Sequence, residues 1–195
     1  MIDLILLGVG WAVYFFVHSL LAATGPKNYI ISVTGLSQKT YRILYNVISA
    51  VGLLVMIGYL SIVSKGALFP VGDELRFVSL SMVVIGVVVI RQAFKQYDMG
   101  EFLGIRFGGN NEFRRKGILN HIRHPLYSGT ILIIIAMFLY SPTYGTMVTM
   151  GVTFLYLAIA IPLEERKLID LYGDKYRRYK KEVPSIIPKI RFKKD

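Results

Sequence analysis

Four long runs of apolar residues constrain this chain more than any other feature. A helix needs about 20 residues to cross the roughly 30 Å of hydrocarbon in a bilayer. The runs have about that length and cover residues 4–23, 43–63, 75–94 and 143–163. A shorter fifth run, 126–140, follows Pro125, a residue suited to the first turn of a helix. The sequence predicts an all-α, polytopic integral membrane protein with about five transmembrane helices, the last two forming a hairpin.

The composition excludes several other classes of protein. Of the 195 residues, 54% are hydrophobic and 18% are charged, whereas soluble domains carry about 25% charged residues. The chain has no cysteine, which excludes a disulfide framework, a cysteine-ligated zinc site and a thiol nucleophile. Because no basic residue precedes the first apolar run, we expect no cleaved signal peptide.

The sequence is expected to form one membrane-embedded domain over residues 1–195. No internal repeat, low-complexity tract or long linker divides it. The expected parts are three helices in 1–96, a cytosolic connecting segment in 97–127, a helical hairpin in 126–163 and a cytosolic tail helix in 164–195.

The basic residues are distributed unevenly around the predicted spans. Of 23 Lys and Arg residues, 21 follow the first, third and fifth runs or lie at their ends, and only Lys65 and Arg76 lie elsewhere. Five spans place those three segments on one face, and basic loops stay cytoplasmic. We therefore expect a multi-pass protein of the cell membrane with its N-terminus outside and its C-terminus cytoplasmic. Anionic membrane lipid then explains the net charge of +11, and neither nucleic acid nor an obligate protein partner is predicted.

Polar residues gather at the inner ends of the last two spans. Arg123 and His124 come directly before Pro125, and Glu164 and Glu165 directly follow the run that ends at residue 163. Because a hairpin brings these two ends together, we expect the four side chains to be neighbours. The start of the fourth span also offers unpaired backbone N–H groups and a positive helix dipole to an anion. A polar cluster at the end of an apolar hairpin is a candidate functional site.

Each of these residues also has a purely structural interpretation. His124 can cap a helix, Arg123 can anchor the chain to lipid phosphate, and the two glutamates can pair with the basic residues that follow them. His18, within the first run, is expected to bond a neighbouring helix. A metal site at His121 and His124 is disfavoured because helix is disfavoured just before a proline, so no metal is predicted.

An amphipathic helix is predicted in the tail. Its apolar residues recur at spacings of 4, 4, 3 and 4, the period of one helical face, whereas the opposite face is basic. A helix of this kind lies in the membrane interface, where it either anchors the tail or covers the candidate site. The stripe consists of Leu168, Tyr172, Tyr176, Tyr179 and Val183.

Three segments of the C-terminal part resemble the signature of a known superfamily. The segments 123–129 (Arg-His-Pro-Leu-Tyr-Ser-Gly), 163–166 (Leu-Glu-Glu-Arg) and 172–179 resemble the integral-membrane methyltransferases. That superfamily includes isoprenylcysteine carboxyl methyltransferases and phospholipid N-methyltransferases, which use S-adenosylmethionine. Segments 18–22, 41–46 and 101–106 are similar to the NnrU-like branch, which includes methanethiol S-methyltransferase.

The resemblance implies roles for individual residues. Glu164 or Glu165 would hold the ribose hydroxyls or the amino group of S-adenosylmethionine. Apart from the resemblance, the chemistry of methyl transfer suggests that Arg123, or the amino end of the helix that starts at Pro125, would hold the methionyl carboxylate. His121 or His124 would serve as a base if the acceptor arrives protonated. The candidate catalytic residues are therefore Arg123, His121 and Glu165. The residues implied to bind the cofactor are Leu119, His124, Pro125, Leu126, Tyr127, Glu164 and Glu165.

Two departures from the superfamily pattern bear on the acceptor and the cofactor contacts. Residues 111–114 read Asn-Glu-Phe-Arg where relatives have His-x-Leu-Val, and 157–162 contain no arginine, unlike the eukaryotic isoprenylcysteine enzymes. The predicted function is S-adenosylmethionine-dependent methyl transfer to a lipophilic or small thiol acceptor that enters from the membrane. The alternatives are methylation of an isoprenylcysteine carboxylate or a phospholipid amine. A transporter or accessory protein is a further alternative. A transporter usually has polar residues near the membrane midplane in paired halves, whereas here the polar residues gather at one face and no internal repeat is present.

Overall fold

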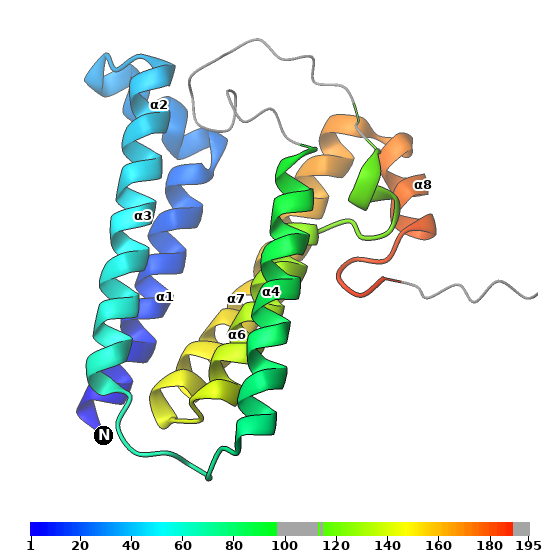
Figure 1. Cartoon of the computed structure of the whole chain (residues 1–195). Coiled ribbons are helices and arrows are strands. Elements are labelled where there is room, and N and C mark those ends of the chain that lie inside the picture. The colour runs from blue at the N-terminus through cyan, green and yellow to red at the C-terminus, as the bar shows by residue number, and fades with distance from the viewer. Residues whose placement is uncertain (97–112, 114, 189–195) are drawn as a thin grey trace, which may run out of the picture. The chain divides into compact units, whose positions relative to one another are not determined.

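The computed structural model describes residues 1–96, 113 and 115–188. All regular secondary structure in these residues is helical (Figure 1). Four helices are long and apolar enough to cross a membrane: α1 (Ile2–Ala22), α3 (Gln38–Val63), α4 (Asp73–Phe94) and α7 (Tyr144–Tyr172). The remaining helices are α2 (Thr24–Thr34), the short 3₁₀ helix η1 (Gly117–Asn120), α6 (Pro125–Tyr140) and α8 (Asp174–Glu182).

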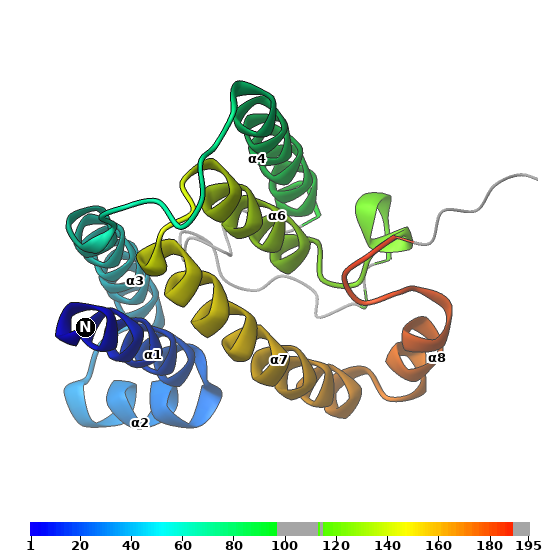
Figure 2. The same cartoon turned by 90° about the horizontal axis from the view of Figure 1, so that it is seen from below.

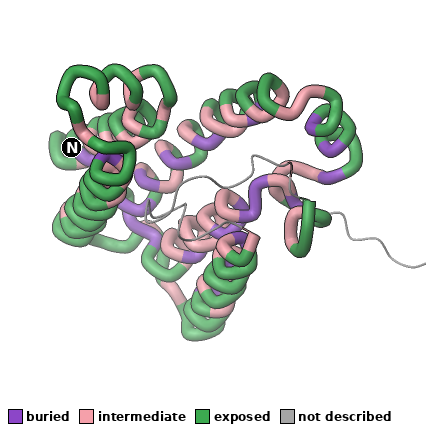
Figure 3. The backbone as a smooth tube through the Cα atoms, turned by 90° about the horizontal axis from the view of Figure 1, so that it is seen from above, coloured by how far each residue is buried: buried purple, intermediate pink, exposed green. Residues whose placement is uncertain are grey.

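These helices confirm the predicted all-α, multi-pass membrane protein. Apart from the end residues 23 and 143, each of the four predicted long runs lies in one of the four long helices. The helix α6 begins at Pro125, as expected. With 16 residues, α6 is about 24 Å long at 1.5 Å per residue, shorter than the hydrocarbon layer. Large apolar residues of the spans are exposed, and only 11% of the most apolar window of α1 or of α3 is buried. Figure 3 colours the exposed parts of the backbone green.

The contacts divide the described chain into two compact units, and α7 contributes to both. The first unit contains Met1–Val71 and Ser141–Tyr156. Within it, the Trp11 indole nitrogen of α1 donates a 2.9 Å hydrogen bond to the Thr149 hydroxyl of α7. His18 of α1 lies 3.0 Å from the Ser49 hydroxyl of α3. His18 thus bonds a neighbouring helix, as its structural interpretation predicts.

The second unit contains α4, α6, η1, α8 and the part of α7 from Leu157 onward. Its helices α4 and α6 pack side by side (Figure 2). A pair of glycines sets how closely they approach. A Cβ atom on Gly129 would lie 2.7 Å from the carbonyl oxygen of Gly86, and one on Gly86 would lie 2.9 Å from the carbonyl oxygen of Gly129. This close crossing fixes α6, which directly follows Arg123 and His124 of the predicted site.

Replacing Gly129 with alanine is expected to destabilise the protein by about 1–3 kcal/mol, because the added methyl group overpacks a backbone contact. The measurement is the free energy of unfolding in detergent. Gly151 of α7 is the matched control, because a Cβ atom there meets no heavy atom within 4 Å. Gly151→Ala should leave stability unchanged or raise it slightly, as alanine favours helix. Equal stability of the two variants would contradict the close crossing.

Candidate functional site

The start of α6 is joined to the segment that follows α8. The backbone N–H groups of Arg123 and His124 donate to the carbonyl oxygens of Pro184 and Ser185, at 2.9 and 3.0 Å. One turn later, the Ser128 hydroxyl donates to the carbonyl of Ile186 at 2.7 Å. The sequence suggested that N–H groups here were available to bind an anion. For Arg123 and His124 this was wrong, because the returning chain supplies their acceptors.

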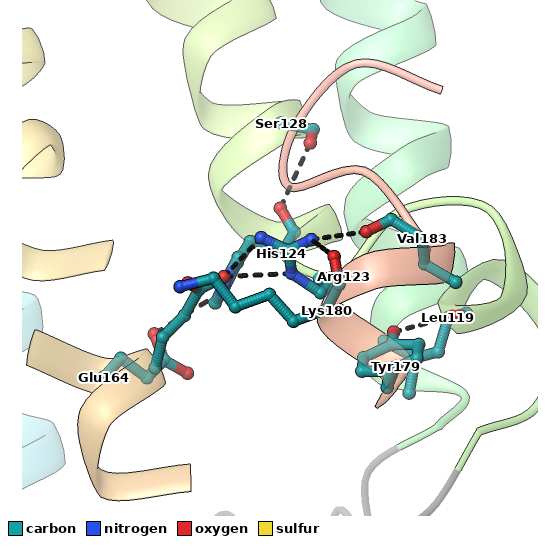
Figure 4. A network of polar contacts seen from close by, with 9 residues as sticks. Leu119, Arg123, His124, Ser128, Glu164, Tyr179, Lys180 and Val183 are labelled. Atoms are coloured by element: carbon teal, nitrogen blue, oxygen red, sulfur yellow. Dashed lines mark hydrogen bonds and ion pairs between the residues drawn. The ribbon is translucent and has the colours of Figure 1, made fainter. Parts of the chain in front are cut away.

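Glu165 of α7 is buried and is the centre of a charge cluster. Its partners Arg123, His124 and Lys180 are labelled in Figure 4. One carboxylate oxygen accepts hydrogen bonds from Arg123, at 2.9 Å from Nε and 2.6 Å from Nη2, and lies 3.2 Å from Nε2 of His124. The other oxygen lies 2.6 Å from Nζ of Lys180. The predicted proximity of the Arg-His and Glu-Glu pairs is confirmed, and both Glu165 oxygens are already engaged by the protein.

Arg123 links three segments of the second unit. Besides its two bonds to Glu165, its Nη1 atom donates to the carbonyl of Lys180 at 2.9 Å and to the carbonyl of Val183. Four of its five N–H groups therefore have acceptors within the chain. The side chain is only 8% exposed, so removing Glu165 would leave a buried guanidinium without a counter-charge.

Glu164 differs sharply from its neighbour. Its side chain is 42% exposed, against 5% for Glu165, and its Oε2 atom lies 3.8 Å from Nδ1 of His124. Adjacent residues of a helix point about 100° apart, so only one of the two can face Arg123. Because a carboxylate only accepts hydrogen bonds, the contact with Glu165 places a proton on Nε2 of His124. The Nδ1 atom is then directed toward Glu164.

The stripe of the tail helix is a buried surface. Tyr176, Tyr179 and Val183 form a small core against which Phe113, Leu168, Ile169 and Tyr172 pack. The Tyr179 hydroxyl donates a 2.6 Å hydrogen bond to the carbonyl of Leu119 in η1. The stripe crosses two helices, since α7 ends at Tyr172 and Gly173 turns the chain with a positive φ of 57°. The apolar side of the tail therefore packs against other parts of the second unit.

The other predicted residues lie around this cluster with unequal exposure. Pro125 is buried, Leu126 is half-buried, and the ring of Tyr127 stacks on that of His124 with centroids 5.6 Å apart. His121 is exposed at the end of η1, and no described side chain pairs with its ring. Residues 111, 112 and 114 and the segment 101–106 lie outside the described residues. Within the described ranges, no group of three His, Asp or Glu residues could hold a metal.

Two features of the site are not evident from the sequence. Lys180 lies on the basic side of the predicted stripe, yet it reaches Glu165. Tyr176 is buried, and its hydroxyl has no hydrogen-bond partner in the described part of the chain. Burial, together with the negative charge of Glu165, raises the pKa of the Tyr176 hydroxyl well above its usual range. The group therefore stays protonated at neutral pH and can act as a donor.

Curated relatives of the chain carry a common name. The methanethiol S-methyltransferase of Crocosphaera subtropica is 32% identical over 103 residues, 52% of this chain and 36% of the relative. Methanethiol S-methyltransferase 1 of Bradyrhizobium diazoefficiens is 41% identical over 78 residues, 39% of this chain and 26% of the relative. That of Pseudomonas deceptionensis is 32% identical over 84 residues, 42% and 30% of the two chains. The chain spans about a third of the length of these relatives or less.

A match to a family model covers far more of the sequence than these pairwise similarities do. The model is described as NnrU protein and matches residues 6–191. That range includes both the N-terminal segments 18–22 and 41–46 and the polar cluster at the start of α6. The chain therefore belongs to the NnrU protein family, the branch that its N-terminal motifs predict.

Proposed function

We propose that this protein is a membrane methyltransferase that uses S-adenosylmethionine to methylate a small thiol or another lipophilic acceptor. The observation that carries the proposal is the half-exposed Glu164 carboxylate beside His124. The same histidine contacts Glu165, which forms a buried ion pair with Arg123. Relatives named methanethiol S-methyltransferase support a small thiol as the acceptor. A carboxylate acceptor has less support, because residues 157–162 of α7 contain no arginine to face it.

The chemistry of the residues fits S-adenosylmethionine. This molecule carries hydroxyl and ammonium donors, and Glu164 is a carboxylate with exposed acceptor oxygens. When bound, S-adenosylmethionine supplies an electrophilic methyl group on a cationic sulfur. Glu164 is the residue that we assign to its ribose hydroxyls or its amino group, and the His124–Tyr127 pair would line the same pocket. Leu119, Pro125 and Leu126 would complete the lining.

Arg123 and Glu165 are better assigned to positioning than to ligand contact. Their hydrogen bonds to each other and to the end of α8 hold His124, α6 and α8 in place. A rigid support matters here, because holding reactants in line can lower a barrier by up to about 7–11 kcal/mol. The cover formed by α8 also limits water, and low dielectric strengthens the attraction between a thiolate and a cationic donor.

A proton acceptor is needed if the thiol arrives protonated. His124 carries its Nε2 proton toward Glu165, which leaves a lone pair on Nδ1. That atom can take the thiol proton, and Glu164 at 3.8 Å would stabilise the resulting positive charge. His121 is exposed and is the less protected candidate for this role. The uneven distribution of basic residues supports a site on the cytoplasmic face, with the N-terminus outside.

Isothermal calorimetry with S-adenosylhomocysteine on the detergent-purified protein tests the proposal. We expect saturable binding of one ligand per chain, whereas homocysteine alone, which lacks the adenosyl group, should bind far more weakly. Incubation with S-adenosylmethionine carrying a labelled methyl group should then label methanethiol in preference to a phospholipid amine. No binding of S-adenosylhomocysteine at millimolar concentration would refute the assignment of a methyltransferase.

A further inference from the structure

The Tyr176 hydroxyl is the most unusual polar group of the second unit. Only 2% of this residue is exposed, yet its oxygen has no hydrogen-bond partner among the residues that the structure describes. Apart from Ser64 in the first unit, no other buried side-chain oxygen or nitrogen in the described ranges shares this condition. Buried polar groups are nearly always paired, so each exception needs an explanation.

Packing alone does not account for a tyrosine at this position. Its ring makes edge contacts with Phe113 and Tyr179, with centroids 6.1 and 5.7 Å apart, inside an apolar cluster. A phenylalanine ring would make the same contacts. It would also avoid the destabilising burial of an unpaired hydroxyl. The neighbouring Tyr179 shows the contrast, because its hydroxyl has a backbone acceptor at 2.6 Å in Leu119.

The surroundings of the hydroxyl belong to the candidate site. Tyr176 lies one helical turn before Lys180 on α8, and the Nζ atom of Lys180 contacts Glu165. The Tyr176 ring also packs beside Tyr179, whose hydroxyl reaches Leu119. Glu165 does not serve as the acceptor of the Tyr176 hydroxyl, since the two carboxylate oxygens are held by Arg123, His124 and Lys180. A protonated donor therefore lies beside the polar cluster with no acceptor in the described chain.

We propose that Tyr176 is a ligand-contacting residue whose O–H group donates a hydrogen bond to the adenosyl part of the bound methyl donor. The inference rests on the proposed function. It assigns a neutral acceptor, a ribose oxygen or an adenine nitrogen, because the nearby cations that could hold the methionyl carboxylate, Arg123 and Lys180, are already paired with Glu165. The tail helix α8 then contributes to the pocket itself as well as covering it.

The variant Tyr176→Phe tests the inference through two measurements with opposite signs. Without ligand, the variant should unfold at the same temperature as the wild type or higher, because an unpaired buried hydroxyl has been removed. Its affinity for S-adenosylhomocysteine should fall about tenfold. The matched control is Tyr179→Phe, which loses a hydrogen bond to Leu119 and should unfold at a lower temperature.

A second probe locates the contact on the ligand. The compound 5′-methylthioadenosine keeps the adenosyl group and lacks the amino-acid part, so Tyr176→Phe should weaken its binding by the same factor. A loss seen only with S-adenosylhomocysteine overturns the adenosyl contact. Wild-type affinity in Tyr176→Phe overturns the inference while leaving the proposed function intact. Destabilisation equal to that of Tyr179→Phe also overturns it, since the hydroxyl would then have a partner within the chain. Failure of the wild type to bind either compound refutes the proposed function itself.

Discussion

Replacing Glu165 with alanine is expected to lower the free energy of unfolding by about 3 kcal/mol. The change removes the acceptor of two Arg123 hydrogen bonds and leaves that guanidinium, 8% exposed, without a counter-charge. Breaking a buried ion pair typically costs about 3–5 kcal/mol. The lower end applies here, because the Lys180 side chain is 47% exposed and can turn to water. Reversible unfolding in detergent, followed by tryptophan fluorescence or circular dichroism, measures the effect.

Glu182 provides a matched control for this variant. It pairs with Arg115, and the two side chains are 55% and 37% exposed. An exposed ion pair contributes about 0–1 kcal/mol, so Glu182→Ala should change stability little. Glu165→Gln should fall between the two alanine variants, since an amide oxygen still accepts from Arg123 but carries no charge. Similar losses in Glu165→Ala and Glu182→Ala would contradict the idea that Glu165 holds the second unit together.

The membrane spans were predictable because length and apolarity alone determine them. A run of about 20 apolar residues has few stable alternatives in a bilayer, and proline marked the start of α6. The helix α2 (Thr24–Thr34) was not predicted. It mixes polar and apolar residues and has no buried residue, and it is followed by Gly35, which has a positive φ of 67°. No long apolar run marks it in the sequence.

The sequence predicted the site in part, and the errors of that prediction have a common physical origin. The proximity of Arg123 and Glu165 followed from chain connectivity. The hydrogen bonds from the backbone N–H groups of Arg123 and His124 to Pro184 and Ser185 could not be predicted. Hydrogen bonds between segments about 60 residues apart leave no local pattern in the sequence. The stripe spacing is also compatible with one helix or with two separated by a glycine turn. Only the backbone reveals the turn at Gly173.

The different roles of the two adjacent glutamates were likewise hidden in the sequence. Both follow the same apolar run, and the resemblance implied that either one holds the cofactor. The geometry separates them by accessibility: Glu165 is buried with both oxygens engaged, and Glu164 is open. One carboxylate therefore supports the structure, whereas its neighbour remains available to a ligand. This difference leads directly to a second substitution with a large expected effect.

Replacing Glu164 with alanine is expected to weaken binding of S-adenosylhomocysteine by about 10- to 100-fold, with little change in stability. A lost hydrogen bond to a charged group costs about 1.5–3 kcal/mol, which corresponds to this range. Stability should hold because the side chain is 42% exposed and its contact with His124, at 3.8 Å, is long. Calorimetric titration measures the affinity, and thermal unfolding without ligand measures the stability.

The two glutamate variants together separate ligand contact from structural support. Glu164→Ala should lose affinity at wild-type stability, whereas Glu165→Ala should lose stability first and affinity only as a consequence. Lowering the temperature should therefore restore part of the affinity of Glu165→Ala, because more of the protein is folded, and none of the affinity of Glu164→Ala. If Glu164→Ala binds like the wild type while a folded Glu165→Ala does not, the ligand contact lies with Glu165. Its two engaged oxygens would then have to exchange protein partners for ligand on binding.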